Sequence, residues 1–196
     1  MIEKQYQINT KKELKDWINY EQSKYFSGKR SFLHKFICCN EIDLLIKHIK
    51  LLRKTEYLFN SGHAILYRFF NFRLNQFQNK YCIHVPCFTC GKGLKIMHVG
   101  PVLINKRAKV YNDVSIHIGV SIVAQGRTDE APIIMDGCVI GVNSTILGGV
   151  AISKNVVVGA NSLVNKNVLE EDIAVAGCPA KKISNNGRTA WEEGTR

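Results

Sequence analysis

Four side chains of the kinds that bind zinc lie close together near the middle of the chain: Cys82, His84, Cys87 and Cys90. Cysteine thiolates and neutral imidazoles are the usual zinc ligands. A structural zinc site, however, usually takes a second pair of ligands that is well separated from the first, whereas these four lie within nine residues. Cysteine is also a common small apolar residue of protein interiors. We therefore predict no metal, and we expect most of the seven cysteines to be reduced thiols in the core.

Two further histidines, His98 and His117, offer a different chemistry. A neutral imidazole, with an ordinary pKa near 6.5, accepts a proton at neutral pH and returns it later in a reaction. Such a group activates a hydroxyl, which is a poor nucleophile until it loses its proton. Whether either imidazole is exposed depends on the elements that hold it.

The chain of 196 residues has a formal charge of +11, but its lysines and arginines are scattered. No basic run is interleaved with aromatic residues, so we predict a solvated surface that attracts small anions rather than nucleic acid. Hydrophobic residues make up 45% of the chain, as in ordinary globular proteins. Because no secretory signal and no apolar run of about 20 residues is present, we expect a cytoplasmic protein.

From residue 83 onward, β-branched aliphatic residues recur every six positions, with a single gap of twelve. At a hydrophobic fraction of 45%, ten consecutive matches would arise by chance about three times in ten thousand. The ten are Ile104, Val110, Ile116, Ile122, Ile134, Ile140, Ile146, Ile152, Val158 and Val164. A second and usually small residue lies two positions before most of them, as at Ala108, Val114, Cys138, Ser144, Val150, Val156 and Ser162.

A six-residue period predicts a coil with three short flat sides, stacked by parallel strand pairing. Each side then sends one aliphatic side chain into a triangular interior. Gly119, Gly141 and Gly159 are expected near the corners, where tight bends need a permissive backbone. The gap of twelve falls at 123–133, a polar segment that we predict to be a loop that protrudes from one corner of the coil.

The first 80 residues show helical periodicity instead. We expect helices at 11–25, at 41–60 and from residue 64, with a break at Ser61-Gly62. An apolar stripe at Ile42, Leu45, Ile46, Ile49 and Leu52 follows one helix face. Single basic residues such as Arg68 and Arg73 stand among the aromatic residues of the helix expected from residue 64, which permits peripheral membrane association. Packing against the coil is the favoured prediction for the apolar face of that helix.

These patterns predict three regions. Residues 1–80 form a helical region that caps one exposed end of the coil. Residues 81–184 form the coil, with its loop at 123–133, and residues 185–196 form a C-terminal tail.

Two segments carry a resemblance to a known family: GLKIMHVGPVLINKRAKVYNDVSIHIGVSI at 93–122 and VVVGANSLVNKNVLEEDIAVAGCPAKKI at 156–183. They resemble the hexapeptide-repeat acetyltransferases, nearest to the serine acetyltransferase-like branch with its capsular and exopolysaccharide enzymes. The resemblance implies a mainly β fold, a left-handed parallel β-helix with an α-helical N-terminal cap. It also implies a homotrimer with active sites between subunits, and acetyl-CoA as the acetyl donor.

By the same resemblance, His98 in the motif Met-His-Val-Gly matches the catalytic base. Strict six-residue phase would point His98 into the core, because it lies six residues before Ile104. A bend at Gly100-Pro101 would shift the phase and turn the ring outward, which is the interpretation that we favour.

The resemblance also suggests residues for the substrates. His117 lies close to one coil after His98 and is expected to bind the acceptor or to orient the base. Asp129 and Glu130 of the loop are further candidates for binding the acceptor and for orienting the imidazole. The closing segment suggests a coenzyme A site, with small residues for the pantetheine arm and lysines for the phosphates. Its residues are Gly141, Gly159, Ala160, Asn165, Lys166, Lys181 and Lys182.

The favoured acceptor is a hydroxyl of a sugar or polysaccharide precursor; the alternative is L-serine, as in cysteine biosynthesis. Serine acetyltransferases carry an acidic residue before the base and a histidine before the loop proline, where this chain has Met97 and Ala131. The short N-terminal region and the ending Gly-Thr-Arg also weigh against serine. Two other classes stay open: a metal-dependent hydratase that uses His84, His98 and His117, and a scaffold without activity.

Overall fold

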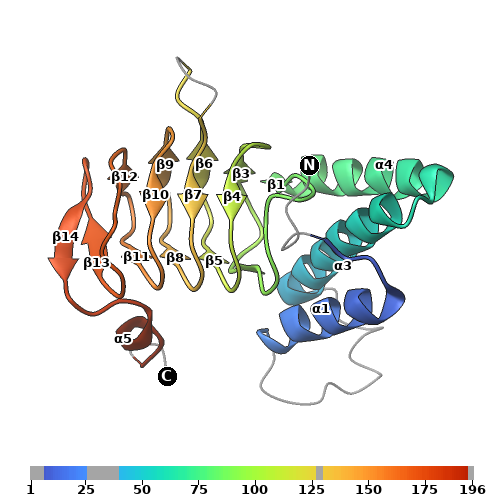
Figure 1. The fold of residues 1–196 in the computed structure, drawn as a ribbon, viewed down its shortest axis with the longest axis horizontal. Coiled ribbons are helices and arrows are strands. Elements are labelled where there is room, and N and C mark those ends of the chain that lie inside the picture. Colours follow the sequence, from blue (N-terminus) through green and yellow to red (C-terminus); the bar gives the residue numbers. More distant parts are fainter. Residues whose placement is uncertain (1–6, 26–39, 127–129, 194–196) are drawn as a thin grey trace.

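A computed structural model describes residues 7–25, 40–126 and 130–193. The helices of the N-terminal region lie at one end, a coil of short strands extends away from them, and a short C-terminal helix lies against the side of the coil (Figure 1). The helices are α1 (Lys11–Ser23), α3 (Glu41–Asn60), α4 (Ala64–Tyr81) and α5 (Arg188–Glu193). The strands are β1 (Ile83–His84), β2 (Lys95–Ile96), β3 (Val102–Ile104), β4 (Lys109–Val110), β5 (Ser115–Ile116), β6 (Ser121–Val123), β7 (Ile133–Ile134), β8 (Val139–Ile140), β9 (Thr145–Leu147), β10 (Ala151–Ile152), β11 (Val157–Val158), β12 (Leu163–Val164), β13 (Ala174–Ala176) and β14 (Lys181–Ser184).

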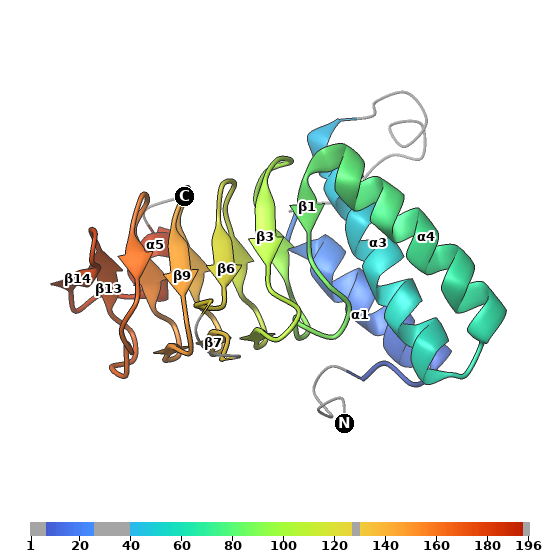
Figure 2. The same ribbon diagram turned by 90° about the horizontal axis from the view of Figure 1, so that it is seen from above.

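The strands form three sheets, each of which is one face of the coil. Sheet A has the order β1-β3-β6-β9-β12, sheet B has β10-β7-β4, and sheet C has β14-β13-β11-β8-β5-β2. Every pairing between named strands is parallel except that of β13 with β14. Successive coils therefore stack on one another, as the view from above shows (Figure 2). The predicted coil of parallel strands is confirmed.

The interior of the coil is filled by the residues of the six-residue period. All ten predicted positions are buried, and none is more than 2% exposed. They pack in one hydrophobic cluster with most of the small residues that precede them. Burying ten such side chains contributes roughly 15–30 kcal/mol before chain entropy is subtracted.

The corner glycines serve two different purposes. Gly119 has φ +80°, in the left-handed region, and a Cβ there would lie 1.9 Å from Asn143 Oδ1. Gly141 and Gly159 do not have positive φ. A Cβ at Gly141 would instead lie 2.6 Å from the Val158 carbonyl oxygen, and one at Gly159 would lie 2.8 Å from the Ala176 Cβ. The expectation of permissive bends is thus wrong for these two glycines, which allow close approach of the next coil.

The helical layer shares its core with the first coils. Leu45, Leu52 and Leu74 belong to the same hydrophobic cluster as the coil interior. The opposite side of α4 is uncovered: Ile65, Leu66, Phe69 and Phe72 are exposed in the chain. The favoured prediction, that this apolar face packs on the coil, is therefore wrong for these four residues. No described helix is both long and apolar enough to cross a bilayer.

A buried ion cluster joins the helical layer to the first coil. The Arg53 guanidinium donates to Glu21 at 2.6 Å and to Glu56 at 2.9 Å. It also donates to the carbonyl oxygens of Cys90 and Gly91, at 2.9 and 2.6 Å. All three charged side chains are at most 1% exposed. Because α1, α3 and the first coil each contribute a group, this cluster fixes how the three pack together.

The described cysteines only partly match their prediction. Five are described and all are free thiols; Cys90 and Cys138 are buried, whereas Cys82 and Cys178 are exposed. Cys87 is partly buried and packs against the core cluster, so three of the five described cysteines are core residues as expected, and the exposed pair is the exception. The remaining two, Cys38 and Cys39, lie outside the described residues.

Candidate active site

His98 lies on the corner at which the chain leaves sheet C and enters sheet A, between β2 and β3. Its side chain is 54% exposed. Ile96, two residues earlier, takes the interior position and pairs with Ile116 of the next coil. Gly100 has φ +147°, and a Cβ there would lie 2.4 Å from Ile118 Cδ1, so the bend requires glycine. The ring therefore points outward, as the predicted phase shift at Gly100-Pro101 requires.

A carboxylate holds His98, and it comes from the helical layer. Glu41 Oε2 lies 3.3 Å from His98 Nδ1, and Glu41 Oε1 accepts a hydrogen bond of 2.7 Å from the Val99 N–H. Glu41 is the first residue of α3, behind the N-cap Asn40. The partial positive charge of a helix N-terminus favours a carboxylate there. With its proton on Nδ1, the imidazole donates to Glu41 and keeps Nε2 as a free acceptor.

A row of stacked positions runs along sheet C from this corner. Met97, His117, Gly141 and Gly159 each follow a buried strand residue, and each backbone N–H donates to the next coil: Met97 to Ile116, His117 to Ile140, Gly141 to Val158 and Gly159 to Val175, at 2.8–3.0 Å. At this position of the row, the first two coils carry the large side chains of Met97 and His117, and the next two coils carry glycine. Beyond His117, the next two positions of this row therefore carry no side chain.

A groove of about 880 Å³ lies on the outer face of sheet C beside this row. Residues of β2 and β5 form its floor, α1 forms one wall and α5 forms the other wall. The residues that line it are Tyr20, Lys24, Lys95, Met97, Ser115, His117, Arg188, Trp191 and Glu192. The His117 ring meets the Trp191 ring edge-on, with centroids 5.9 Å apart. Burial, together with the charges of His98 and Lys95, lowers the pKa of His117. His117 is therefore neutral at pH 7 and suited to hydrogen bonding.

The C-terminal helix α5 is anchored to the coil rather than free of it. The Arg188 guanidinium donates to the backbone carbonyl oxygen of Gly137 at 2.9 Å and to that of Asp113. Its Nε donates to Glu192 at 2.7 Å. The helix lies against the side of the coil (Figure 1), where it supplies a wall of the groove.

The other predicted site residues are distributed over the coil. Ala160 follows Gly159 on the corner that carries His98. Asn165 and Lys166 follow β12, on the corner between sheets A and B. Lys181 and Lys182 lie on β14, where Lys182 pairs with Glu170. The structure thus brings Gly141, Gly159 and Ala160 onto the corner of His98 and His117, but not these other four residues.

The loop carboxylates do not contact His98 within the described chain. The loop connects β6 and β7, on the corner between sheets A and B. Glu130 lies beside Gly149, where an added Cβ would meet its Oε2 at 2.6 Å. Asp129 lies outside the described residues. The carboxylate beside the imidazole is instead Glu41, which the sequence analysis missed.

Across residues 7–25, 40–126 and 130–193, no group of three His, Cys, Asp or Glu side chains is arranged to hold a metal ion. His84 lies on β1 of sheet A, while His98 and His117 lie on the corner that precedes that sheet. The three histidines of the hydratase alternative therefore form no such group.

Comparison with known proteins identifies serine acetyltransferases as relatives, although no family model matches the chain. The Serine acetyltransferase of Buchnera aphidicola subsp. Acyrthosiphon pisum is 33% identical over 135 residues, which are 67% of this chain and 48% of that protein. That of Haemophilus influenzae is 30% identical over 139 residues, 69% of this chain and 51% of that protein. Serine acetyltransferase 2 of Arabidopsis thaliana is 31% identical over 170 residues, 83% and 52% respectively. The chain thus spans about half the length of these relatives.

Solved structures support the fold over a longer part of the chain. A serine acetyltransferase from Brucella abortus strain S19 in complex with coenzyme A matches with a TM-score of 0.70 at 22% identity, covering 90% of this chain and 70% of that one. A serine acetyltransferase in complex with cysteine matches with a TM-score of 0.69 at 23% identity, covering 89% and 71%. At these identities the similarity establishes the fold alone.

The relatives correct the predicted acceptor. The sequence analysis favoured a sugar or polysaccharide precursor, but each relative described above is named serine acetyltransferase. That prediction is contradicted, and its alternative, L-serine, is the better supported acceptor.

Proposed function

We propose that this protein transfers the acetyl group of acetyl-CoA to the hydroxyl of L-serine, with His98 as the general base. The observation that carries the proposal is the exposed His98 imidazole held by Glu41 through Nδ1 at 3.3 Å. This arrangement leaves Nε2 directed away from its carboxylate partner. The similarity to named serine acetyltransferases supports the same activity and the same acceptor.

In the proposed reaction, Nε2 of His98 accepts the proton of the serine hydroxyl while the hydroxyl oxygen attacks the thioester carbonyl carbon. The imidazolium that forms is stabilised by the Glu41 carboxylate. It then returns the proton to the sulfur of the departing coenzyme A, as the carbon–sulfur bond breaks and O-acetylserine forms. General base catalysis of this kind is worth about 10²–10⁴ in rate.

The coenzyme A site is part of the same proposal. The pantetheine arm would lie along the corner that carries Gly141, Gly159 and Ala160, on the coils that follow those of His98 and His117. These three residues are small, so no large side chain stands on that corner between the arm and the backbone. Lysines near the later coils, including Lys166 and Lys181, are candidates for the phosphates.

The assembly that we propose is a homotrimer of left-handed coils, with the active site between neighbouring copies. Within one chain, the loop after β6 and the His98 corner lie on different edges of the coil. A neighbouring copy would bring its loop, with Asp129 and Glu130, to the groove of the first.

An acceptor screen with labelled acetyl-CoA tests the function. L-Serine, nucleotide sugars and oligosaccharides are offered separately to the purified protein, and labelled product is measured. We expect acetylation of L-serine and none of the sugars above the level seen without enzyme. Transfer to a sugar alone, or to none of these acceptors, would contradict the proposal.

We predict that Glu41→Gln lowers kcat by at least about tenfold and leaves the KM for acetyl-CoA unchanged. The glutamine amide would offer a donor to Nδ1, which favours the tautomer with its proton on Nε2 and removes the free acceptor. Glu41→Asp should retain more activity than Glu41→Gln. The matched control is Glu171→Gln, an exposed carboxylate near the far end of the coil. Equal kcat values for Glu41→Gln and this control would exclude a positioning role, provided that both melt at the wild-type temperature.

A further inference from the structure

Lys95 is a cation of the groove without a hydrogen-bonding or ionic partner among the residues that the structure describes. The Lys24 ammonium pairs with Asp113, and the Arg188 guanidinium is occupied by Glu192 and two carbonyl oxygens. Within the described part of the chain, the Lys95 ammonium forms neither a hydrogen bond nor an ion pair. A half-buried ammonium in this condition has lost part of its hydration without gaining a counter-charge.

The surroundings of Lys95 are cationic. Burial lowers the pKa of Lys95, and the charges of Lys24 and Arg188 lower it further, while the Glu192 carboxylate acts in the opposite sense. Glu192 is already bonded to Arg188 Nε at 2.7 Å. A bound anion would therefore relieve the repulsion among the three cations.

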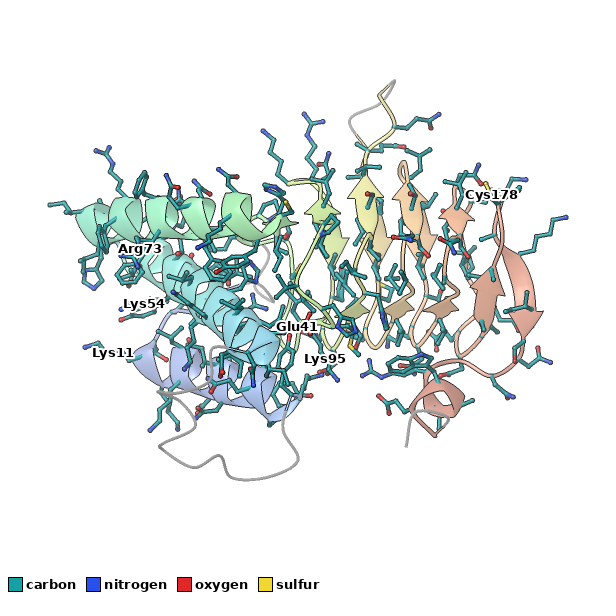
Figure 3. All side chains as sticks on the ribbon, turned by 180° about the vertical axis from the view of Figure 1, so that it is seen from behind. Lys11, Glu41, Lys54, Arg73, Lys95 and Cys178 are labelled. Atoms are coloured by element: carbon teal, nitrogen blue, oxygen red, sulfur yellow. The ribbon has the colours of Figure 1, made fainter. Side chains whose placement is uncertain are left out.

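The position of Lys95 indicates which anion fits. Lys95 pairs in register with Ser115 on the floor of the groove, and both side chains line it. His98 follows three residues later, around the corner after Met97. Figure 3, which labels Glu41 and Lys95, shows both at the junction of the helical layer and the coil. An anion at Lys95 is thus close to the reacting end of the site.

An acceptor carboxylate fits this position better than a coenzyme A phosphate does. Gly141 and Gly159 lie on later coils of the His98 corner, whereas Lys95 lies on the first coil of sheet C. The phosphates are at the far end of the pantetheine arm, so an arm that follows this corner toward the later coils carries them away from Lys95. In L-serine, by contrast, the carboxylate is only a few covalent bonds from the hydroxyl that must reach His98.

We propose that the Lys95 ammonium binds the carboxylate of the acceptor amino acid in the groove between α1 and α5. The inference rests on the proposed function, because it assigns the acceptor end of the same site. Lys95 is thereby a specificity residue, which selects acceptors with a carboxylate beside the hydroxyl.

The test compares L-serine with L-serinamide, which keeps the hydroxyl but replaces the carboxylate by a neutral amide. Lys95→Met keeps an unbranched side chain and removes the charge. We expect it to raise the KM for L-serine by about 10- to 100-fold, the effect of losing a hydrogen bond to a charged group. The KM values for L-serinamide and acetyl-CoA should change less than about twofold. The control is Lys11→Met, an exposed lysine at the start of α1, for which all three KM values should match wild type.

Two kinetic outcomes would overturn the inference. An unchanged KM for L-serine in Lys95→Met would show that the carboxylate binds elsewhere. A raised KM for acetyl-CoA with an unchanged KM for L-serine would assign Lys95 to a phosphate.

Failure of the proposed function is recognised separately, because wild type would then acetylate neither L-serine nor L-serinamide. Calorimetry of the two compounds, on wild type and on Lys95→Met, tests the anion site without turnover. Tighter binding of L-serine than of L-serinamide by wild type alone supports the inference, and equal binding by wild type contradicts it.

Discussion

Replacing His98 with asparagine is expected to lower kcat for acetyl transfer by at least about 100-fold, which is the contribution of a positioned general base. Asparagine retains a polar side chain but has no group that accepts a proton at neutral pH. Because the His98 side chain is exposed on a corner rather than packed in the core, the fold and its melting temperature should be unaffected. Rates at saturating substrates provide the measurement.

The matched control for this experiment is His63→Asn. His63 is an exposed histidine at the start of α4 that makes no side-chain capping hydrogen bond. Its replacement should leave kcat at the wild-type value. A His98→Asn protein that is folded and as active as this control would refute the proposed base.

The second large effect concerns stability. Arg53→Met should lower the free energy of unfolding by about 3–5 kcal/mol, because it leaves two buried carboxylates without their cation. Burial already raises the pKa of Glu56 above its ordinary value, and loss of the guanidinium would raise it further. The carbonyl oxygens of Cys90 and Gly91 would also lose a donor. Urea unfolding, with the midpoint and the slope both determined, gives the measurement.

Two further variants separate charge from packing in the same experiment. Arg68→Met, at an exposed position of α4, should change the free energy of unfolding by less than about 0.5 kcal/mol. Combining Arg53→Met with Glu21→Gln and Glu56→Gln removes every charge of the cluster and should recover part of the loss. A loss below about 1 kcal/mol for Arg53→Met alone would mean that the cluster does not hold the layers together.

The coil could be predicted from the sequence because its determinant is local and repeated. Each interior residue is set by its own position in the period, so the ten aliphatic positions locate the three faces without knowledge of any long-range contact. The same reasoning located the bend at Gly100-Pro101, since the dipeptide breaks the phase next to His98. By contrast, Gly141 and Gly159 are needed because the neighbouring coil leaves no room for a Cβ at either position. The periodic pattern of the sequence does not give the distance between coils, so it could not predict this role.

The residues that complete the site are distant in sequence and carry no pattern. Glu41 opens a helix, where an acidic residue is ordinary, and nothing in the sequence relates it to an imidazole 57 residues later. This separation in sequence had a consequence for the predicted acceptor. Met97 in place of a neighbouring acid weighed against serine, yet a carboxylate reaches His98 from α3 instead. Arg53 was missed for the same reason, because its partners other than Glu56 lie on another helix and on the first coil.

Helix α3 carries both Glu41 and Arg53, and this has a consequence for interpreting damage to the protein. The carboxylate beside the imidazole is only as well aligned as the helix that presents it, and that helix is aligned by an ion cluster buried elsewhere along its length. Substitutions in the cluster should therefore slow the enzyme as well as lower its melting temperature, although Glu21, Arg53 and Glu56 do not line the groove. Slow variants that also melt early should accordingly be sought in this cluster, whereas slow variants that melt normally point to the groove or to the His98 corner.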